Sequence, residues 1–265
     1  MKQVLKYPGA KIKLADWIIS NIPSHSVYLE PFFGSGAVFF NKPKSEIETI
    51  NDINDDVYNY FKVLRDKPYE LIKVLSFTPY SRSEYKRAYE TEGVVDCVEK
   101  ARLFAVRCFM GFGASNHYRN GFRSSQSHNS PDVARIWASL SETLELASKR
   151  LLQAQIENLD YKELLKRYDS EDVFIYLDPP YLPSTRKKYL YKNEMSEDDH
   201  KELLTIINAH PAKIMISGYD SPLYESMLKG WRKKTCESQI ECGLKREEVI
   251  WMNYSDNKIQ GELFE

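Results

Sequence analysis

Short apolar runs bounded by polar residues recur along the chain, and they predict buried strands. The clearest lie at 27–30, 47–50, 155–158, 173–177 and 213–217, where branched and aromatic side chains dominate. Near-continuous apolar strands separated by helical segments are typical of a mostly parallel sheet covered by helices. The pattern therefore predicts an α/β fold.

Two other regions depart from this alternation. Residues 232–240 and 247–254 are strand-like and flank a short turn at 242–245, which predicts a C-terminal antiparallel hairpin. From about residue 57 to residue 150 the pattern is helical, apart from a polar, glycine-rich interruption at 111–131. We therefore expect a core domain of residues 1–56 and 151–265, with a helical insert at 57–150.

The composition is that of an ordinary globular protein. Of the 265 residues, 42% are hydrophobic and 28% are charged, and no apolar run approaches the roughly 20 residues of a membrane helix. Lysines interrupt the first residues, so no signal peptide is expected. We expect a cytoplasmic protein, a monomer by default, without a membrane partner. The four cysteines match no zinc motif, so no metal site is expected.

The net charge of −1 does not indicate a nucleic-acid partner, but the distribution of charge does. Between residues 101 and 135 the chain carries Arg102, Arg107, Arg119, Arg123 and Arg135 against a single acid, Asp132. The stretch 182–192 has four cations and no acid. A basic face on a neutral protein suits a surface that follows phosphates. The alternative interpretation is a pair of solvated loops.

The sharpest chemical signal is Asp178-Pro179-Pro180-Tyr181, directly after the apolar run 173–177. The carboxyl end of a parallel strand is where α/β folds bind ligands. The prolines fix the backbone, so that the Asp178 carboxylate and the Pro179 carbonyl can accept both hydrogens of an exocyclic amino group. This grip localises the nitrogen lone pair for attack on a methyl sulfonium. Tyr181 offers a flat stacking face. The alternative is a proline-stiffened turn.

A second signal is the glycine turn Pro31-Phe32-Phe33-Gly34-Ser35-Gly36, which we expect to lead into a helix from Ala37. Its glycines allow a ligand close to the backbone, and a helix N-terminus would offer free N–H groups. A dinucleotide fingerprint would need a third glycine where this chain has Phe39. Asp52, at the end of the next strand, lies where an acid accepts hydrogen bonds from a ribose.

Four motifs in this order resemble the Dam-type DNA N6-adenine methyltransferases. They are Tyr7-Pro8-Gly9-Ala10-Lys11, then Glu30 to Gly36, then Asn51-Asp52-Ile53-Asn54, and finally Asp178 to Tyr181. The likeness runs from Tyr7 to about Tyr219. It implies a Rossmann-like methyltransferase fold with a target-recognition insert, S-adenosylmethionine as cofactor, and methyl transfer to adenine N6 in a short duplex DNA sequence.

The resemblance also assigns residues to the cofactor. Tyr7, Lys11, Asp52 and Asp178 would contact S-adenosylmethionine, and Asp160 would reach its adenine. Gly34, Ser35 and Gly36 would wrap the methionine part, and Glu30 and Phe33 belong to the same set. The expected catalytic residues are Asp178, Pro179, Pro180 and Tyr181.

The resemblance further implies that the target base leaves the duplex, because a stacked amino group is out of reach. Residues 116–123 combine cations, amides and aromatics, which bind phosphates, read base edges and wedge into a stack. Residues 182–195 are expected to form a lid over cofactor and base. A surface loop without a partner is the other interpretation of 116–123. The candidate DNA-binding residues are Asn116, Tyr118, Arg119, Asn120, Arg123, Arg186, Lys187 and Lys188.

Other functions stay open at this point. The two-acceptor geometry suits cytosine N4 in DNA as well as adenine N6. An enzyme that methylates RNA or a protein amide would leave the basic insert unexplained. A catalytically silent DNA-binding homologue would not need an intact Asp178 motif and glycine turn. A nicotinamide-dependent oxidoreductase is disfavoured by Phe39.

Overall fold

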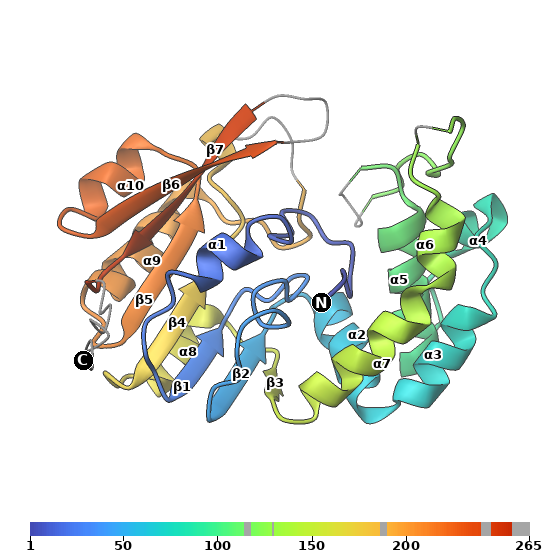
Figure 1. The fold of residues 1–265 in the computed structure, drawn as a ribbon, viewed down its shortest axis with the longest axis horizontal. Coiled ribbons are helices and arrows are strands. Elements are labelled where there is room, and N and C mark those ends of the chain that lie inside the picture. Colours follow the sequence, from blue (N-terminus) through green and yellow to red (C-terminus); the bar gives the residue numbers. More distant parts are fainter. Residues whose placement is uncertain (114–117, 129, 186–189, 240–244, 256–265) are drawn as a thin grey trace, which may run out of the picture.

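One seven-stranded sheet runs through the part of the chain that the structure describes (Figure 1). This computed structural model describes residues 1–113, 118–128, 130–185, 190–239 and 245–255, without the side chains of 238, 239, 245 and 246. The strand order is β3-β2-β1-β4-β5-β7-β6. The strands are β1 (Val27–Glu30), β2 (Ile47–Asn51), β3 (Gln155–Glu157), β4 (Val173–Leu177), β5 (Lys213–Gly218), β6 (Arg232–Gln239) and β7 (Lys245–Met252).

The sheet confirms the predicted fold class. Strands β3, β2, β1, β4 and β5 are parallel to one another, whereas β7 is antiparallel to both β5 and β6. The C-terminal hairpin therefore forms one side of the sheet, as the sequence predicts. Each predicted strand is present, with ends that differ by two residues at most.

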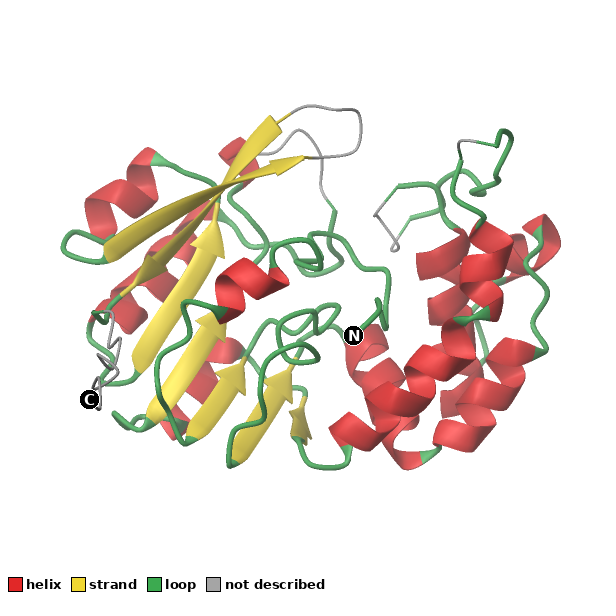
Figure 2. Ribbon diagram, viewed as in Figure 1, coloured by secondary structure: helices red, strands yellow, loops and turns green. Residues whose placement is uncertain are grey.

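Alternating side chains of the strands enter two separate apolar cores, because successive residues of a strand point to opposite faces. Leu29 and Ile175 pack in the core under α8 (Tyr161–Arg167), α9 (Glu197–Asn208) and α10 (Pro222–Met227). Tyr28 and Phe174 pack in the other core, together with α1 (Ala15–Ile19). Figure 2 shows the sheet between these helices.

The helices between β2 and β3 lie together beside the sheet (Figure 1). They are α2 (Asp55–Asp66), α3 (Pro68–Ser76), α4 (Arg82–Arg87), α5 (Cys97–Met110), α6 (Val133–Ala138) and α7 (Leu140–Leu151). Their buried residues belong to the same apolar cluster as one face of the sheet. The boundaries expected after residues 56 and 150 fall inside α2 and α7, and the division into two domains stays a prediction.

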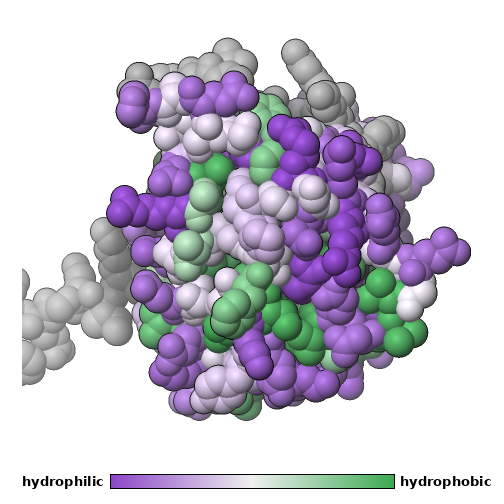
Figure 3. Space-filling view, turned by 90° about the vertical axis from the view of Figure 1, so that its right-hand side faces the viewer, coloured by the Kyte–Doolittle hydropathy of each residue, from purple (hydrophilic) through white to green (hydrophobic). Residues whose placement is uncertain are grey.

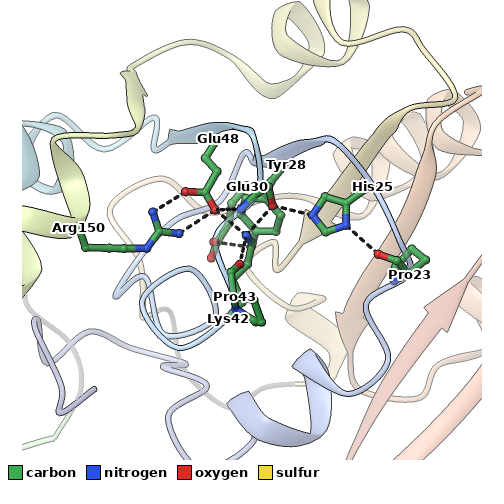
Figure 4. Close-up of polar contacts among 9 residues, drawn as sticks. Pro23, His25, Tyr28, Glu30, Lys42, Pro43, Glu48 and Arg150 are labelled. Atoms are coloured by element: carbon green, nitrogen blue, oxygen red, sulfur yellow. Dashed lines mark hydrogen bonds and ion pairs between the residues drawn. The ribbon is translucent and has the colours of Figure 1, made fainter.

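A buried ionic network joins this helical segment to the sheet (Figure 4). The Glu48 carboxylate on β2 accepts hydrogen bonds from Lys42 Nζ at 2.6 Å and from Arg150 of α7 at 2.7 Å. Lys42 also donates to Ser45 Oγ, which bonds the His25 ring. The network fixes the chain between the glycine turn and β2.

Polar residues begin several helices by accepting hydrogen bonds from the first free N–H groups. At the start of α9, Ser196 and Asp199 form a reciprocal capping box. Across the described segments, the structure contains no helix with the length and apolar character needed to span a membrane.

Candidate functional site

A cavity of about 250 Å³ opens at the carboxyl ends of β1 and β4. These two parallel strands are neighbours, and the chain continues from β1 to β2 on one side and from β4 to β5 on the other. Such a reversal leaves a crevice between the loops that follow the two strands. The N-terminal segment 7–11 and residues 191–195 complete the walls.

The glycine turn forms one wall of this cavity. Gly34 and Gly36 have φ of 50° and 67°, a conformation that residues with a Cβ adopt at a cost. A Cβ on Gly36 would lie 2.4 Å from Phe33 Cζ, so a side chain there would also displace buried rings.

The helix expected from Ala37 is absent. Residues 37–41 form consecutive turns, in which Phe40 N–H bonds the Gly36 carbonyl, and Lys42 N–H bonds the Val38 carbonyl. Pro43 supplies no N–H to continue the ladder. The expected free helix N-terminus is therefore wrong. The Gly34 N–H is taken by Asp52 instead, at 2.8 Å.

Asp52 and its neighbours form the second wall. The Asp52 carboxylate accepts hydrogen bonds from Gly34 N–H and from Asn54 N–H at 2.9 Å. Burial raises its pKa to about 6, against the lowering effect of these two bonds. Asn51 donates to the carbonyls of Pro31 and Leu159, and thereby holds the ends of β1 and β3 together.

Glu30 is a carboxyl group buried at the base of the cavity. Its side chain accepts a hydrogen bond from Tyr28 Oη at 2.7 Å, and the residue is 2% exposed. Burial raises the pKa of Glu30 to about 8, and the Asp178 charge adds to the effect. Glu30 and Asp52 thus favour an incoming positive charge, because a cation would stabilise their ionised forms.

Asp178 lies on the opposite side, held by two elements far away in sequence. Its carboxylate pairs with Lys11 Nζ at 2.9 Å and accepts a hydrogen bond from Ser217 Oγ of β5 at 2.7 Å. Burial opposes the charge on Lys11, but Asp178 and Glu248 outweigh it and raise the Lys11 pKa. Lys11 is therefore an ammonium, and Asp178 is an oriented carboxylate.

Tyr181 is packed behind this pair. Its hydroxyl donates to Glu248 Oε2 at 2.7 Å, Lys11 Nζ lies 4.7 Å from its ring centroid, and the Tyr219 ring lies at 4.5 Å. The residue is 9% exposed.

The structure brings most of the predicted cofactor and catalytic residues to one cavity. Those that line it are Tyr7, Lys11, Glu30, Phe33, Gly34, Ser35, Asp52, Asp160, Asp178 and Pro180. Gly36, Pro179 and Tyr181 are not among the described residues that line it. Asp160 is also the N-cap of α8, where its carboxylate accepts Lys162 N–H.

Two residues of the site, Ser217 and Glu248, were not predicted from the sequence. Ser217 carried a readable signal, since it ends the apolar run of β5 beside the Asp178 strand. No signal in the local sequence marks Glu248, because its position depends on how β7 pairs with β5 and β6. Tyr191, Asn193 and Glu194 also line the cavity, and they belong to the segment 182–195 that was expected to cover cofactor and base.

The predicted DNA-binding loop is tied to α4 and its flanks by tyrosines. The hydroxyls of Tyr80, Tyr85 and Tyr89 donate to the carbonyls of Arg123, Asn120 and Tyr118, at 2.8, 2.8 and 3.4 Å. Tyr118 and Arg119 are exposed, whereas Asn120 and Arg123 are half-buried. Asn116, Arg186, Lys187 and Lys188 lie outside the described residues.

Two of the arginines in the basic stretch 101–135 are buried and do not contribute to a basic surface. Arg102 pairs with Glu84 and Glu99, and Arg107 pairs with Asp56, and both arginines are 7% exposed. The sequence pattern could not separate them from Arg119 and Arg123, because Glu84 and Asp56 come from other helices. Figure 3 shows that the face on the side of the helical segment is mostly hydrophilic, with small hydrophobic areas.

Comparison with known proteins agrees with this geometry. The chain is 24% identical to the type II methyltransferase M1.LlaDCHI of Lactococcus lactis, over 97% of this chain and 96% of that protein. It is 26% identical to the type II methyltransferase M.MjaIII of Methanocaldococcus jannaschii, over 96% and 99%. The DNA adenine methylase of Vibrio cholerae is 25% identical, over 85% and 84%.

A solved structure of a precorrin 8w decarboxylase from Methanobacterium thermoautotrophicum aligns with a TM-score of 0.39 and 10% identity, over 94% of this chain and 91% of that one. A similarity this low says nothing about function. The family model for the D12 class N6 adenine-specific DNA methyltransferases, in contrast, matches residues 7–242. The chain therefore belongs to the D12 class N6 adenine-specific DNA methyltransferase family, and it is an enzyme of that class.

Proposed function

We propose that this enzyme binds S-adenosylmethionine in the cavity at the ends of β1 and β4. It would transfer the methyl group to N6 of an adenine extruded from duplex DNA. The observation that carries the proposal is that the glycine turn and Asp178, on neighbouring strand ends, line the same cavity. Had packed side chains filled the space between them, the two motifs could not serve one reaction.

The residues present fit a cationic cofactor. Glu30 and Asp52 are buried carboxyl groups whose pKa values burial raises to about 8 and about 6, and at Glu30 the nearby Lys42 charge does not offset this rise. S-adenosylmethionine carries a sulfonium and an ammonium, and either would favour the ionised carboxylates. Gly34 and Ser35 would allow close approach of its methionine part, and Asp160 would lie at its adenine. When bound, the cofactor supplies the electrophilic methyl group.

The Asp178 carboxylate would accept a hydrogen bond from the target amino group. Lys11 and Ser217 hold the carboxylate, but two carboxylate oxygens offer about four acceptor positions, so room remains for an amino hydrogen. The Pro179 carbonyl would accept the second hydrogen. Because Asp178 is fixed before the base arrives, little reorganisation is needed when charge develops on the nitrogen.

The helical segment would provide the DNA contacts. We infer that Tyr118, Arg119, Asn120 and Arg123 bind or read the duplex, with residues 57–150 as a recognition domain. Arg119 is exposed, as a phosphate contact requires. The tyrosine hydrogen bonds to the loop carbonyls support a defined loop shape. We also infer a cytoplasmic monomer, and sedimentation of the purified protein tests the oligomeric state.

The test is methyl transfer followed by mapping. Unmethylated plasmid DNA is incubated with the purified enzyme and methyl-labelled S-adenosylmethionine, and the product is read by long-read sequencing that detects modified bases. N6-methyladenine at a fixed short sequence is the expected result. N4-methylcytosine would overturn the choice of base, and no incorporation under any buffer would favour a silent DNA-binding homologue.

A further inference from the structure

Glu248 is a buried acid at the functional edge of the sheet that the sequence motifs do not include. It lies on β7, which runs antiparallel to β5. The early part of β7 therefore meets the carboxyl ends of the parallel strands, where Asp178 and Ser217 also lie. Glu248 is 8% exposed, and burying a carboxylate is costly unless it is paired.

Glu248 contacts the catalytic motif directly, through Tyr181. Tyr181 Oη donates to Glu248 Oε2 at 2.7 Å. The ring of Tyr181 in turn lies under Lys11 Nζ, at 4.7 Å, and Lys11 pairs with Asp178 at 2.9 Å. A hydrogen bond to an ionised acceptor is stronger than one between neutral groups, so Glu248 restrains the ring more than a neutral acceptor would.

Glu248 acts on the reaction indirectly, through this restraint on Tyr181 and through its charge near Lys11. Like Tyr181, it is not among the described residues that line the cavity, and it lies behind the Lys11–Asp178 pair rather than at the cavity wall. A stacking ring that is already fixed loses less conformational freedom when a base arrives, and small displacements at such sites are costly. The Tyr219 ring, 4.5 Å from that of Tyr181, limits motion from another side.

We infer that Glu248 is a positioning residue, whose hydrogen bond with the Tyr181 hydroxyl orients the tyrosine of the catalytic motif for the extruded adenine. This inference rests on the proposed function. Glu248 would contribute to target-base binding and to the methyl-transfer step, and it would leave cofactor affinity nearly unchanged.

The experiment removes the hydrogen bond between Glu248 and Tyr181 by changing each partner in turn and then both together. Glu248→Ala removes the acceptor, Tyr181→Phe removes the donor but keeps the ring, and the double variant removes both. Glu248→Gln keeps an acceptor oxygen without the charge. The matched control is Glu247→Ala, because Glu247 is the neighbouring, exposed acid of β7. Circular dichroism shows which variants fold, and Tyr181→Phe keeps the test valid if Glu248→Ala does not.

Two measurements are made on the mapped target sequence. The first is the single-turnover methylation rate, and the second is the fluorescence of 2-aminopurine at the target position, which rises when the base leaves the stack. We expect Glu248→Ala and Tyr181→Phe each to lower the rate about tenfold, as for loss of a charge-assisted hydrogen bond. The double variant should be no slower than either, with Glu248→Gln intermediate and Glu247→Ala like wild type.

Three outcomes would overturn the inference: wild-type rates in both single variants, losses that multiply in the double variant, or an unchanged 2-aminopurine signal. A cofactor dissociation constant within about twofold of wild type supports it, because a general loss of structure would also weaken cofactor binding. If the wild-type enzyme forms no N6-methyladenine, the proposed function fails before any variant is compared.

Discussion

Removing the Glu48 carboxylate is expected to destabilise the protein strongly, because it leaves a lysine buried without its counterion. The side chains of Lys42 and Glu48 are 1% and 0% exposed, and that of Arg150 is 16% exposed. Truncating one partner of a buried pair typically costs about 3–5 kcal/mol. In Glu48→Ala, Lys42 Nζ would keep the Pro43 carbonyl and Ser45 Oγ, both at 2.8 Å, and the Tyr28 ring at 4.2 Å.

These remaining contacts place the expected loss at the lower end of that range, about 3 kcal/mol. For a chain of this size, such a loss lowers the melting temperature by about 6–12 °C. The free energy of unfolding is measured by urea denaturation at pH 7.5, with tryptophan fluorescence as the signal. Glu46→Ala is the matched control, because Glu46 is an exposed acid two residues away.

The pH dependence gives an independent check. Burial alone would raise the pKa of Glu48, but hydrogen bonds from Arg150 and Lys42 outweigh burial and lower it. A carboxyl group with a depressed folded pKa stabilises the fold above its unfolded pKa, near 4.3, and loses that contribution as the pH falls further. The difference between wild type and Glu48→Ala should therefore shrink below about pH 4. A loss under about 1 kcal/mol at neutral pH would refute the reasoning.

Three further predictions concern the reaction. Asp178→Ala should abolish methyl transfer while the protein stays folded, as judged by circular dichroism, and retained turnover would count against the assigned role. Affinity for S-adenosylmethionine should rise with pH in two steps, near the pKa of Asp52 at about 6 and that of Glu30 at about 8, because only the ionised carboxylates attract a cation. In calorimetry from pH 5 to 9, Asp52→Asn should remove the lower step and Glu30→Gln the upper one, and a flat wild-type profile would contradict both assignments. Arg119→Ala should weaken duplex binding on all sequences alike and reduce the salt slope by about 1; an unchanged slope would show that Arg119 contacts no phosphate.

Much of the fold was readable from the sequence because buried parallel strands are apolar on both faces. The runs at 27–30 and 173–177 coincide with β1 and β4. Adjacent parallel strands present their carboxyl ends at one edge, so the residues that follow them were expected to meet. Asp178 and the glycine turn do line one cavity.

The features that were not predicted correctly depend on interactions between segments that are distant in the sequence. The apolar residues from Ala37 to Phe40 resemble the start of a helix, but buried aromatic packing and Pro43 give turns instead. The sequence placed Arg102 and Arg107 in a basic surface, but both are buried and form ion pairs with acids on other helices. Glu248 could not be placed because nothing in its local sequence sets the pairing of β7 with β5.

The pairing of Lys11 with Asp178, 167 positions apart, bears on how this enzyme is made. Translation delivers the lysine early and the aspartate late, and Glu248 of the closing hairpin is delivered later still. A nascent chain on the ribosome therefore contains the glycine turn long before the wall of the cavity that carries Asp178 has been made. Catalytic competence should appear abruptly, once the closing hairpin has been synthesised, rather than grow with chain length.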